Sequence, residues 1–365
     1  MPSADGPQPS QAPAPAQPAP SAYEGYGHQP DDGSGDTSAG PVAFSGSRLA
    51  WGDLPRHVRA TINELCGGAV VAETSSTSGF SPGYAAIVET SDGHELFVKA
   101  VSPEQNPGSP VLARREIIAA AALPPEAHAP RLLWSADDDE WVVLGFEAVR
   151  GRSPELPWRP ADLTRCLAIV DELSRCRPLP GHGLGSAREI FGAQFRGWAA
   201  IRDGDGLVST GAPGGAESVA HSAGALGTWA VTHLDALIDL EQGAASAVEG
   251  EALVHGDLRA DNILLDGPRT SVIDWPHACV GAPWFDLVSM LPSVAMQGGG
   301  DAQELFAAQP LASSVDVRDL RSVLAAVAGQ LAYDSLVPAP LNIPNLRAFQ
   351  CAQAVEALTW LRGLS

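Results

Sequence analysis

The residues with the clearest chemical potential lie in one short stretch, LVHGDLRADNILLDGPRTSVIDW, at residues 253–275. Asp257, Asn262 and Asp274 stand there beside apolar runs that are typical of buried segments. The runs NILL and TSVI flank DGPR, and Asp-Gly-Pro is strong turn chemistry, so we expect a β-hairpin with its tip near residue 268. Asn262 lies six residues before that tip and Asp274 six after it, so the hairpin brings both to the same end.

Asp257 precedes Asn262 by five residues, on a loop that can fold over the same end of the hairpin. Converging carboxylates repel one another and burial raises that cost, so such a group usually holds a cation. Ligands that are all oxygens favour a hard metal, above all Mg²⁺, which keeps some waters and takes phosphate oxygens as its other ligands. The stretch therefore predicts metal-assisted phosphoryl transfer.

The segment HGDLRADNILL with the later VIDW resembles the catalytic region of the aminoglycoside phosphotransferase and choline kinase family, within the protein-kinase-like fold. The resemblance covers roughly residues 65–300. It implies that Asp257 is the catalytic base, which accepts or orients the proton of a substrate hydroxyl, and that Asn262 and Asp274 bind Mg²⁺. It also implies that His255 braces the loop by hydrogen bonds.

The sequence leaves two roles open for each of three further residues. Arg259 could contact phosphate or form an ion pair with a neighbour, and the residue types do not separate these alternatives. Asp261 fits a solvated loop acid better than a third metal ligand. Asp286, in GAPWFDL, is expected to anchor the catalytic loop or to cap the helix that begins near Trp284.

The nucleotide side of the resemblance depends on Lys99 and Glu116. Lys99 is the single lysine of the chain and lies in ELFVKAV, the third predicted strand, and Glu116 lies on the next predicted helix. In this fold a lysine at that strand holds the nucleotide phosphates and a glutamate on the helix orients it. The plainer alternatives are a surface charge at a strand end and a helix-surface acid paired with Arg115.

Two backbone segments complete the predicted nucleotide site. TSSTSGFSPGYAA lies between the first two predicted strands, where a phosphate-covering loop belongs; Gly79 and Gly83 would let the backbone approach phosphate, and Ser78 could donate hydrogen bonds. Phe146 and Ala148, in the expected hinge between the lobes, would offer backbone groups to a purine. Backbone recognition carries no side-chain signature, so the resemblance implies ATP and leaves GTP open.

The order of the segments predicts an α+β fold with a small antiparallel-sheet N-lobe and a mostly helical C-lobe. The resemblance implies that these form the two lobes of a protein-kinase-like fold. Residues 1–45, rich in Pro, Ala and Gly, are expected to be a disordered tail. Residues 46–149 would form the nucleotide-binding lobe, and residues 150–365 the helical lobe with the catalytic loop and the acceptor site. The strands are expected at 68–75, 84–90, 94–101, 131–136 and 140–148, and helices from an Asp53 N-cap to about Leu65 and at 111–122, 160–176, 187–202, 217–242, 284–296, 315–335 and 344–363.

Bulk composition excludes several classes of function. The 43 acidic against 22 basic residues argue against nucleic-acid binding, and no apolar run approaches the roughly 20 residues of a membrane helix. Five scattered cysteines suggest neither zinc nor a disulfide framework, which predicts reduced thiols and a cytoplasmic location. Nothing in the sequence sets the oligomeric state.

The sequence thus predicts an ATP- or GTP-dependent phosphotransferase with a small-molecule hydroxyl acceptor. The alternative is a nucleotide-binding module of kinase fold with little turnover, which would act through a protein partner by its Pro-rich tail. A protein kinase is disfavoured because no D-F-G or A-P-E segment is present.

Overall fold

The computed structural model describes residues 48–76, 82–204, 219 and 224–364. All of them belong to one of the two units into which the chain divides, residues 39–365. The tail predicted to be disordered, residues 1–45, lies outside the described residues. No helix in the described ranges is long and apolar enough to cross a membrane.

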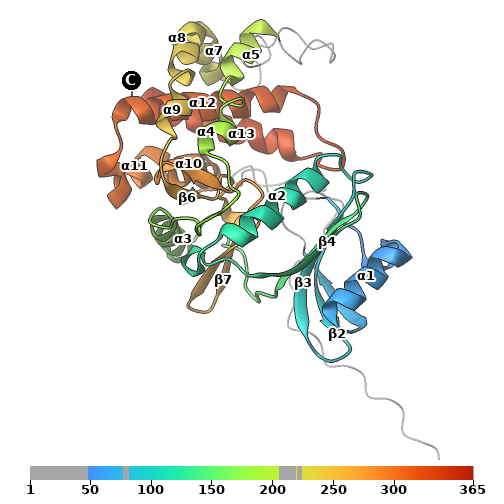
Figure 1. Cartoon of the computed structure of the whole chain (residues 1–365). Helices are drawn as coiled ribbons and strands as arrows, with labels where there is room; N and C mark the ends of the chain where they lie inside the picture. Colours follow the sequence, from blue (N-terminus) through green and yellow to red (C-terminus); the bar gives the residue numbers. More distant parts are fainter. Residues whose placement is uncertain (1–47, 77–81, 205–218, 220–223, 365) are drawn as a thin grey trace, which may run out of the picture. The chain divides into compact units, whose positions relative to one another are not determined.

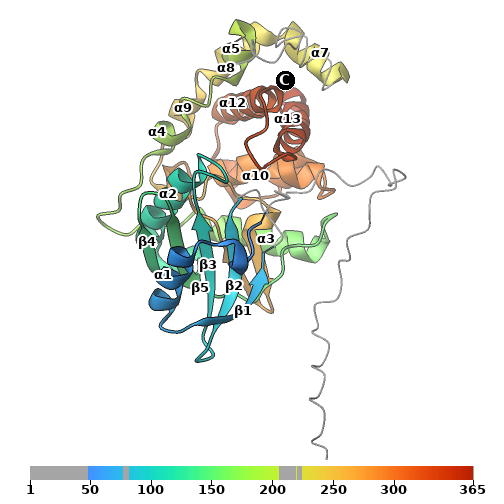
Figure 2. The same ribbon diagram turned by 90° about the vertical axis from the view of Figure 1, so that its right-hand side faces the viewer.

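The N-lobe is a five-stranded antiparallel sheet in the order β1-β2-β3-β5-β4 (Figure 2). Its β-branched and apolar segments form strands at the five predicted places, so this part of the prediction is confirmed. The central strands β2 and β5 are largely buried on both faces, whereas the edge strand β4 alternates between partly buried and exposed positions. The bounds are β1 Val70–Ser75, β2 Tyr84–Thr90, β3 Glu95–Val101, β4 Leu132–Asp137 and β5 Val142–Glu147.

Two helices cover this sheet. Helix α1 (Arg56–Cys66) packs Val58 and Ile62 into one apolar cluster, and α2 (Ser109–Ala122) packs Ala113 into another. The predicted Asp53 N-cap of the first helix is wrong. The N-cap position is Pro55, while Asp53 ends a short 3-10 helix, η1 (Trp51–Asp53), and accepts a hydrogen bond from the Ala50 amide at 2.9 Å.

The C-lobe is built around helices α10, α12 and α13, which lie together in both views (Figures 1 and 2). Small residues along α12 let its neighbours approach closely, and its middle is buried. The helices are α3 Pro160–Leu173, α4 Ala187–Phe191, α5 Gly197–Asp203, α7 Gly224–Thr232, α8 Leu234–Glu241, α9 Ala244–Ala247, α10 Phe285–Met296, α11 Ala302–Ala307, α12 Val317–Leu336 and α13 Leu346–Gly363, with 3-10 turns η2 Pro125–Ala127 and η5 Pro310–Ser314.

The helix predicted over 187–202 is wrong in one respect, because the chain breaks after Phe191 and resumes as α5 at Gly197. The break lets α5 cross α12 at very close range. A Cβ on Gly197 would lie 2.1 Å from the backbone of Gly329, and a Cβ on Gly329 would lie 2.7 Å from the Trp198 ring, so both positions require glycine. Trp198 then packs over the crossing and donates its indole N–H to the Ala325 carbonyl at 2.8 Å.

The helix predicted over 217–242 is also interrupted, because α7 ends at Thr232 and α8 begins at Leu234. Most of its expected first turns lie outside the described residues. The other predicted helices are present with small changes at their ends, and the short helices α9 and α11 were not predicted.

Two small ladders lie where the lobes join. Strands β7 (Ile263–Asp266) and β8 (Arg269–Val272) form the predicted hairpin, with Gly267 and Pro268 at its tip. Strands β6 (Ala252–Val254) and β9 (Cys279–Gly281) pair beside it and were too short to predict. The chain crosses from β5 to the C-lobe along β7, where Arg152 and Leu265 exchange backbone hydrogen bonds at 3.1 and 2.7 Å.

Candidate active site

The catalytic loop follows β6 and is held by a tight turn at Gly256. This residue has a φ of 81°, and a Cβ there would lie 2.7 Å from the His277 carbonyl oxygen, so glycine is required on both grounds. The carboxylate of Asp286, on the first turn of α10, accepts the amides of His255 at 2.7 Å and of Gly256 at 2.8 Å. Asp286 is therefore the anchor of the loop, one of the two roles expected for it.

Burial raises the pKa of Asp286, and the two backbone N–H groups that bind the carboxylate oppose this rise. On the other side of the loop, the His255 ring packs against Trp275, and its Nε2 lies 3.0 Å from the carbonyl oxygen of Ile273. His255 thus ties the catalytic loop to the end of β8, as a bracing role requires.

The hairpin brings the three predicted oxygen-bearing residues to one end. Asn262 closes a 3-10 turn, η4 (Ala260–Asn262), and donates its amide N–H to the Asp257 carbonyl at 2.7 Å. The Ile273 amide donates to the Asn262 carbonyl at 3.0 Å, which places the next residue, Asp274, beside the loop. Because the amino group of Asn262 is used, its side-chain oxygen is the atom that could bind a cation.

Asp274 has a left-handed backbone, with a φ of 68°. Such a conformation is uncommon for a residue other than glycine, and strained backbones concentrate at functional sites. The turn directs the carboxylate toward the N-lobe, where its Oδ1 lies 2.8 Å from the ammonium of Lys99. The sheet and the catalytic hairpin meet at this ion pair.

Lys99 also binds Glu116 of α2, with its Nζ 2.8 and 2.9 Å from the two carboxylate oxygens. Both side chains are largely withdrawn from solvent, at 18% exposure for Lys99 and 6% for Glu116. Both plainer alternatives are therefore wrong: the ammonium is not a surface charge at a strand end, and the acid is not a helix-surface residue paired with Arg115. The Lys99 ammonium also lies 5.8 Å from the centre of the Phe146 ring.

The three charges shift one another's pKa values. Burial alone would lower the pKa of Lys99, but the carboxylates of Asp274 and Glu116 outweigh it and raise that pKa. Burial would raise the pKa of Asp274, but the Lys99 ammonium holds it below its usual range. For Glu116 burial dominates and raises the pKa, with Lys99 opposing. The site thus holds a permanent cation at the mouth of the catalytic hairpin.

The predicted phosphate-covering loop is only partly described. Ser78 and Gly79 lie outside the described residues. Gly83 has a φ of 118°, and a Cβ there would lie 2.9 Å from the Ala100 carbonyl oxygen. The packing of β2 on β3 therefore requires glycine at position 83. The sequence had indicated a different reason, the approach of the backbone to phosphate.

The expected hinge residues lie where β5 runs into the linker. Phe146 is buried in the sheet between β3 and β4, with its ring toward Lys99. The Glu147 amide donates to the Arg131 carbonyl at 3.0 Å, so this N–H is already used by the protein. Ala148 follows directly, and its part in nucleotide binding stays a prediction.

The structure separates the two roles that the sequence left open for Arg259. Its guanidinium binds the two oxygens of Asp261 at 3.0 and 2.9 Å and also forms a very short contact with the Asp257 carboxylate. It lies 5.8 Å from the Phe349 ring, on α13. The ion-pair alternative for Arg259 is thus observed, and the interpretation of Asp261 as a solvated acid is wrong because its side chain is only 9% exposed.

Two more residues border the site without a signal in the sequence spacing. Burial lowers the pKa of His277, while Asp257 and Asp274 nearby act to raise it. Burial also lowers the pKa of Arg48, and Asp274 opposes this, so a second cation lies within electrostatic reach of that carboxylate. Both residues are near the candidate site only because of the tertiary fold. Among the described residues, no three His, Cys, Asp or Glu side chains gather into a group that could hold a metal.

Comparisons with known proteins agree with this architecture. The profile of the "Phosphotransferase enzyme family" matches residues 77–322. A thermostable mutant of aminoglycoside phosphotransferase APH(4)-Ia, solved with ADP and hygromycin B, is similar in structure with a TM-score of 0.54 at 17% identity, over 84% of this chain and 98% of that one. Choline kinase LicA from Streptococcus pneumoniae gives a TM-score of 0.53 at 16% identity, over 83% and 99%.

Spectinomycin phosphotransferase APH(9)-Ia, solved with ADP and spectinomycin, gives a TM-score of 0.50 at 13% identity, over 83% of this chain and 98% of that one. No curated protein matched the chain in a sequence comparison. At such low identities the structural likeness shows the fold, and it confirms the predicted kinase-like two-lobed architecture. Because the family profile covers well over half of the sequence, the chain belongs to the phosphotransferase enzyme family.

Proposed function

We propose that this protein transfers the terminal phosphate of ATP or GTP to a hydroxyl group of a small molecule. The observation that carries the proposal is the ion-paired arrangement of Glu116, Lys99 and Asp274, directly beside the loop that bears Asp257 and Asn262. A permanent cation on the sheet and oxygen ligands on the hairpin are what a bound nucleoside triphosphate requires.

Asp257 is the proposed catalytic base. Its loop is fixed by Asp286 and Asn262, and its carboxylate is held by Arg259. In the transfer, the acceptor oxygen forms a bond to the terminal phosphorus as the bond to the nucleoside diphosphate breaks. The hydroxyl proton passes to the Asp257 carboxylate. A base whose position is fixed before the reaction lowers the entropic part of the barrier.

Asp274 and Asn262 are the proposed Mg²⁺ ligands, and their donor set fits that ion. One carboxylate and one amide oxygen are hard ligands, and two protein ligands leave positions for phosphate oxygens and water. Bound there, Mg²⁺ would neutralise charge on the phosphates. Lys99 would hold the phosphates from the N-lobe side, with Glu116 orienting its ammonium.

The acceptor is proposed to be a small metabolite or drug-like molecule that carries a hydroxyl group. Similar solved proteins support this class, since two were solved with hygromycin B or spectinomycin and a third is a choline kinase. The strong net negative charge, −21, is compatible with a cationic acceptor.

A phosphate-transfer screen tests the proposal. The full chain would be incubated with labelled MgATP or MgGTP and, in separate reactions, aminoglycosides, macrolides, choline-like amines and amino-acid alcohols, with Asp257→Asn as the inactive control. We expect transfer to at least one acceptor by the native chain alone. Tight nucleotide binding without transfer to any acceptor would contradict the enzyme and favour a nucleotide-binding module.

A further inference from the structure

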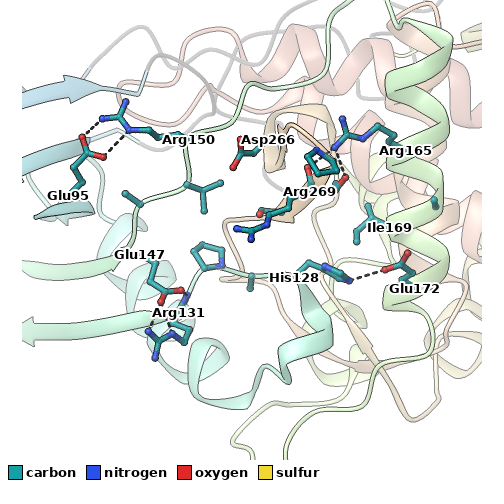
Figure 3. Close-up of a pocket in the computed structure, with 18 of the residues that line it drawn as sticks. Glu95, His128, Arg131, Glu147, Arg150, Arg165, Ile169, Glu172, Asp266 and Arg269 are labelled. Atoms are coloured by element: carbon teal, nitrogen blue, oxygen red, sulfur yellow. Dashed lines mark hydrogen bonds and ion pairs between the residues drawn. The ribbon is translucent and has the colours of Figure 1, made fainter.

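A groove of about 1130 Å³ lies outside the candidate active site, at the junction of the two lobes (Figure 3). Its walls come from the α2–β4 loop around His128, from the end of β5 at Glu147, from α3, and from the β7–β8 hairpin. The volume is slightly above the roughly 300–1,000 Å³ of typical small-molecule sites, so a small ligand would fill part of the groove. None of the proposed catalytic or metal-binding residues lines it, although Ala148, one of the two expected hinge residues, does.

Strand geometry separates this groove from the nucleotide site. Successive side chains on a strand point to opposite faces. The Phe146 ring on β5 therefore faces Lys99, while its neighbour Glu147 points the other way and lines the groove. A ligand in the groove would approach the hinge from the side opposite to the nucleotide.

Most carboxylates of the groove already have a cationic or histidine partner. Figure 3 shows three such pairs around its rim. Paired charges of this kind offer little net attraction to a ligand. The pairs are Glu95 with Arg150 (2.8 Å), Glu147 with Arg131 (2.7 Å), and Glu172 with His128 (2.8 Å).

Two guanidinium groups of the groove form no ion pair with a carboxylate of the described residues. Arg165 donates to neutral acceptors, the Arg269 carbonyl at 2.6 Å and the Thr270 hydroxyl at 3.3 Å. Arg269 points its side chain into the groove (Figure 3), and no described residue forms an ion pair or hydrogen bond with its guanidinium. The Ser271 hydroxyl lies on the same wall.

Asp266 is the remaining acid on the groove wall. It is the hairpin partner of Arg269 in the backbone register, yet the two side chains form no ion pair. Four arginines and four carboxylates line the groove, so it is formally uncharged, in a chain with a net charge of −21. Two of these guanidiniums lack an ion-pair partner among the described residues, and guanidiniums with hydroxyl donors beside them are suited to an anion.

We propose that this groove binds a small phosphate-bearing anion, with Arg269 and Arg165 as its principal ligands. Guanidinium groups match the oxygens of phosphate in geometry and charge. Thr270 and Ser271 supply further donors from the same strand.

The position of the groove gives such a ligand a means of affecting the active site. The α2–β4 loop is tied to the hairpin by the Val272 amide, which donates to the His128 carbonyl at 3.0 Å, and the β5–α3 linker is tied to it through Arg152 and Leu265. The groove is lined by residues of this loop, of this linker and of the hairpin that both contact. An anion held there would bias the angle between the lobes, and hence closure of the nucleotide site.

Hydrogen-exchange mass spectrometry of the full chain tests this site without any need for turnover. Exchange in the hairpin, residues 263–272, and in residues 128–131 would be followed in potassium phosphate, in glucose 6-phosphate and in potassium chloride at equal ionic strength, with and without MgADP. We expect slower exchange in both segments with either phosphate, and not with chloride. A stronger effect of glucose 6-phosphate would point to an organic phosphate, and equal effects to inorganic phosphate.

The variant Arg269→Ala should raise the half-maximal concentration of the phosphate effect about tenfold, because it removes charge-assisted hydrogen bonds. Its control is Arg318→Ala, another exposed arginine, on α12, which should respond like the native chain. Equal protection in chloride, or the same phosphate response in Arg269→Ala as in the native chain, would overturn the site. Neither result depends on catalysis, so failure here is distinct from failure of the proposed phosphotransfer.

Discussion

The Lys99 ammonium on β3 lies 2.8 Å from the Asp274 carboxylate after β8, although 175 residues separate them. Glu116 holds the same ammonium from α2. Lys99 therefore connects the sheet, the adjacent helix and the catalytic hairpin. Nucleotide binding should depend on this connection as a whole, because each acid helps to keep the lysine charged and in place.

Replacing Asp274 by Ala should remove the magnesium dependence of nucleotide affinity. The variant lacks the carboxylate proposed as a metal ligand, while Lys99 and Glu116 remain to hold phosphate. Calorimetric titration with ADP, with and without Mg²⁺, should show a clear magnesium effect in the native chain and almost none in Asp274→Ala. A magnesium effect of native size in the variant would contradict the assignment of Asp274.

Arg259→Gln should lower kcat by about 100-fold, because the Asp257 carboxylate would lose the guanidinium that holds it in position. The affinity for nucleotide, measured by calorimetry, should change little since Arg259 is not among the proposed nucleotide ligands. Arg318→Gln, on the surface of α12, is the matched control. A rise in KM with unchanged kcat would mean that Arg259 binds the acceptor and does not position the base.

Asp162→Asn should destabilise the fold by about 1 kcal/mol at neutral pH. Asp162 of α3 accepts hydrogen bonds from Arg152 of the interlobe linker at 2.7 and 2.9 Å. These bonds hold the pKa of Asp162 below its ordinary value of 3.8. The stabilisation is therefore present above about pH 4 and is lost as the pH falls below that value.

The difference in free energy of unfolding between the native chain and Asp162→Asn, measured by urea denaturation, should shrink between pH 7 and pH 3. The control is Asp171→Asn on the same helix, whose partner Arg175 is well exposed, and it should have a smaller effect at neutral pH. An Asp162→Asn effect that is independent of pH would show that the charge of this carboxylate is not what anchors the linker.

Two asparagines join the lobes on a second side. The Asn106 side chain donates to the Leu341 carbonyl at 3.0 Å, and the Asn342 side chain donates to the Gln105 carbonyl at 2.7 Å. Asn106 also accepts the Gly108 amide at 2.9 Å, at the start of α2. This helix carries Glu116, so the contact should steady the partner of Lys99.

Asn342→Ala should therefore speed hydrogen exchange at the start of α2 and lower the stability by about 1 kcal/mol. Asn345→Ala is the matched control, because Asn345 occupies the N-cap position of α13 but its side chain makes no capping hydrogen bond. Exchange in α2 that is equally fast in both variants would mean that Asn342 has no specific role in holding the helix.

Much of the fold could be predicted because local signals and tertiary structure agree. The five strands, the DGPR hairpin and the convergence of Asn262 and Asp274 follow from apolar runs and turn residues. The helix break before Gly197 could not be predicted, because its cause is the close crossing of α5 and α12 at Gly197 and Gly329. A close approach between segments so far apart in sequence leaves no pattern in either one.

The sequence predicted which residues form the candidate site better than it predicted the contacts that hold them in place. Lys99 and Glu116 were identified because they lie on the third predicted strand and on the helix after it, where the family that the sequence resembles carries a lysine and a glutamate. The buried ion pair between Arg259 and Asp261 could not be distinguished from the sequence, because two charges two residues apart are equally consistent with a solvated loop. Only burial, with 14% of the Arg259 side chain exposed, distinguishes the two situations.

The most direct test of the proposed chemistry is a paired measurement on Asp257→Asn. The variant keeps the shape of the side chain but cannot accept a proton in the same way. We predict that phosphate transfer to an acceptor identified in the screen falls by about 1000-fold or more, while the calorimetric affinity for MgADP stays within about twofold of the native value. Turnover within tenfold of the native chain, with nucleotide binding intact, would contradict the assignment of Asp257 as the base.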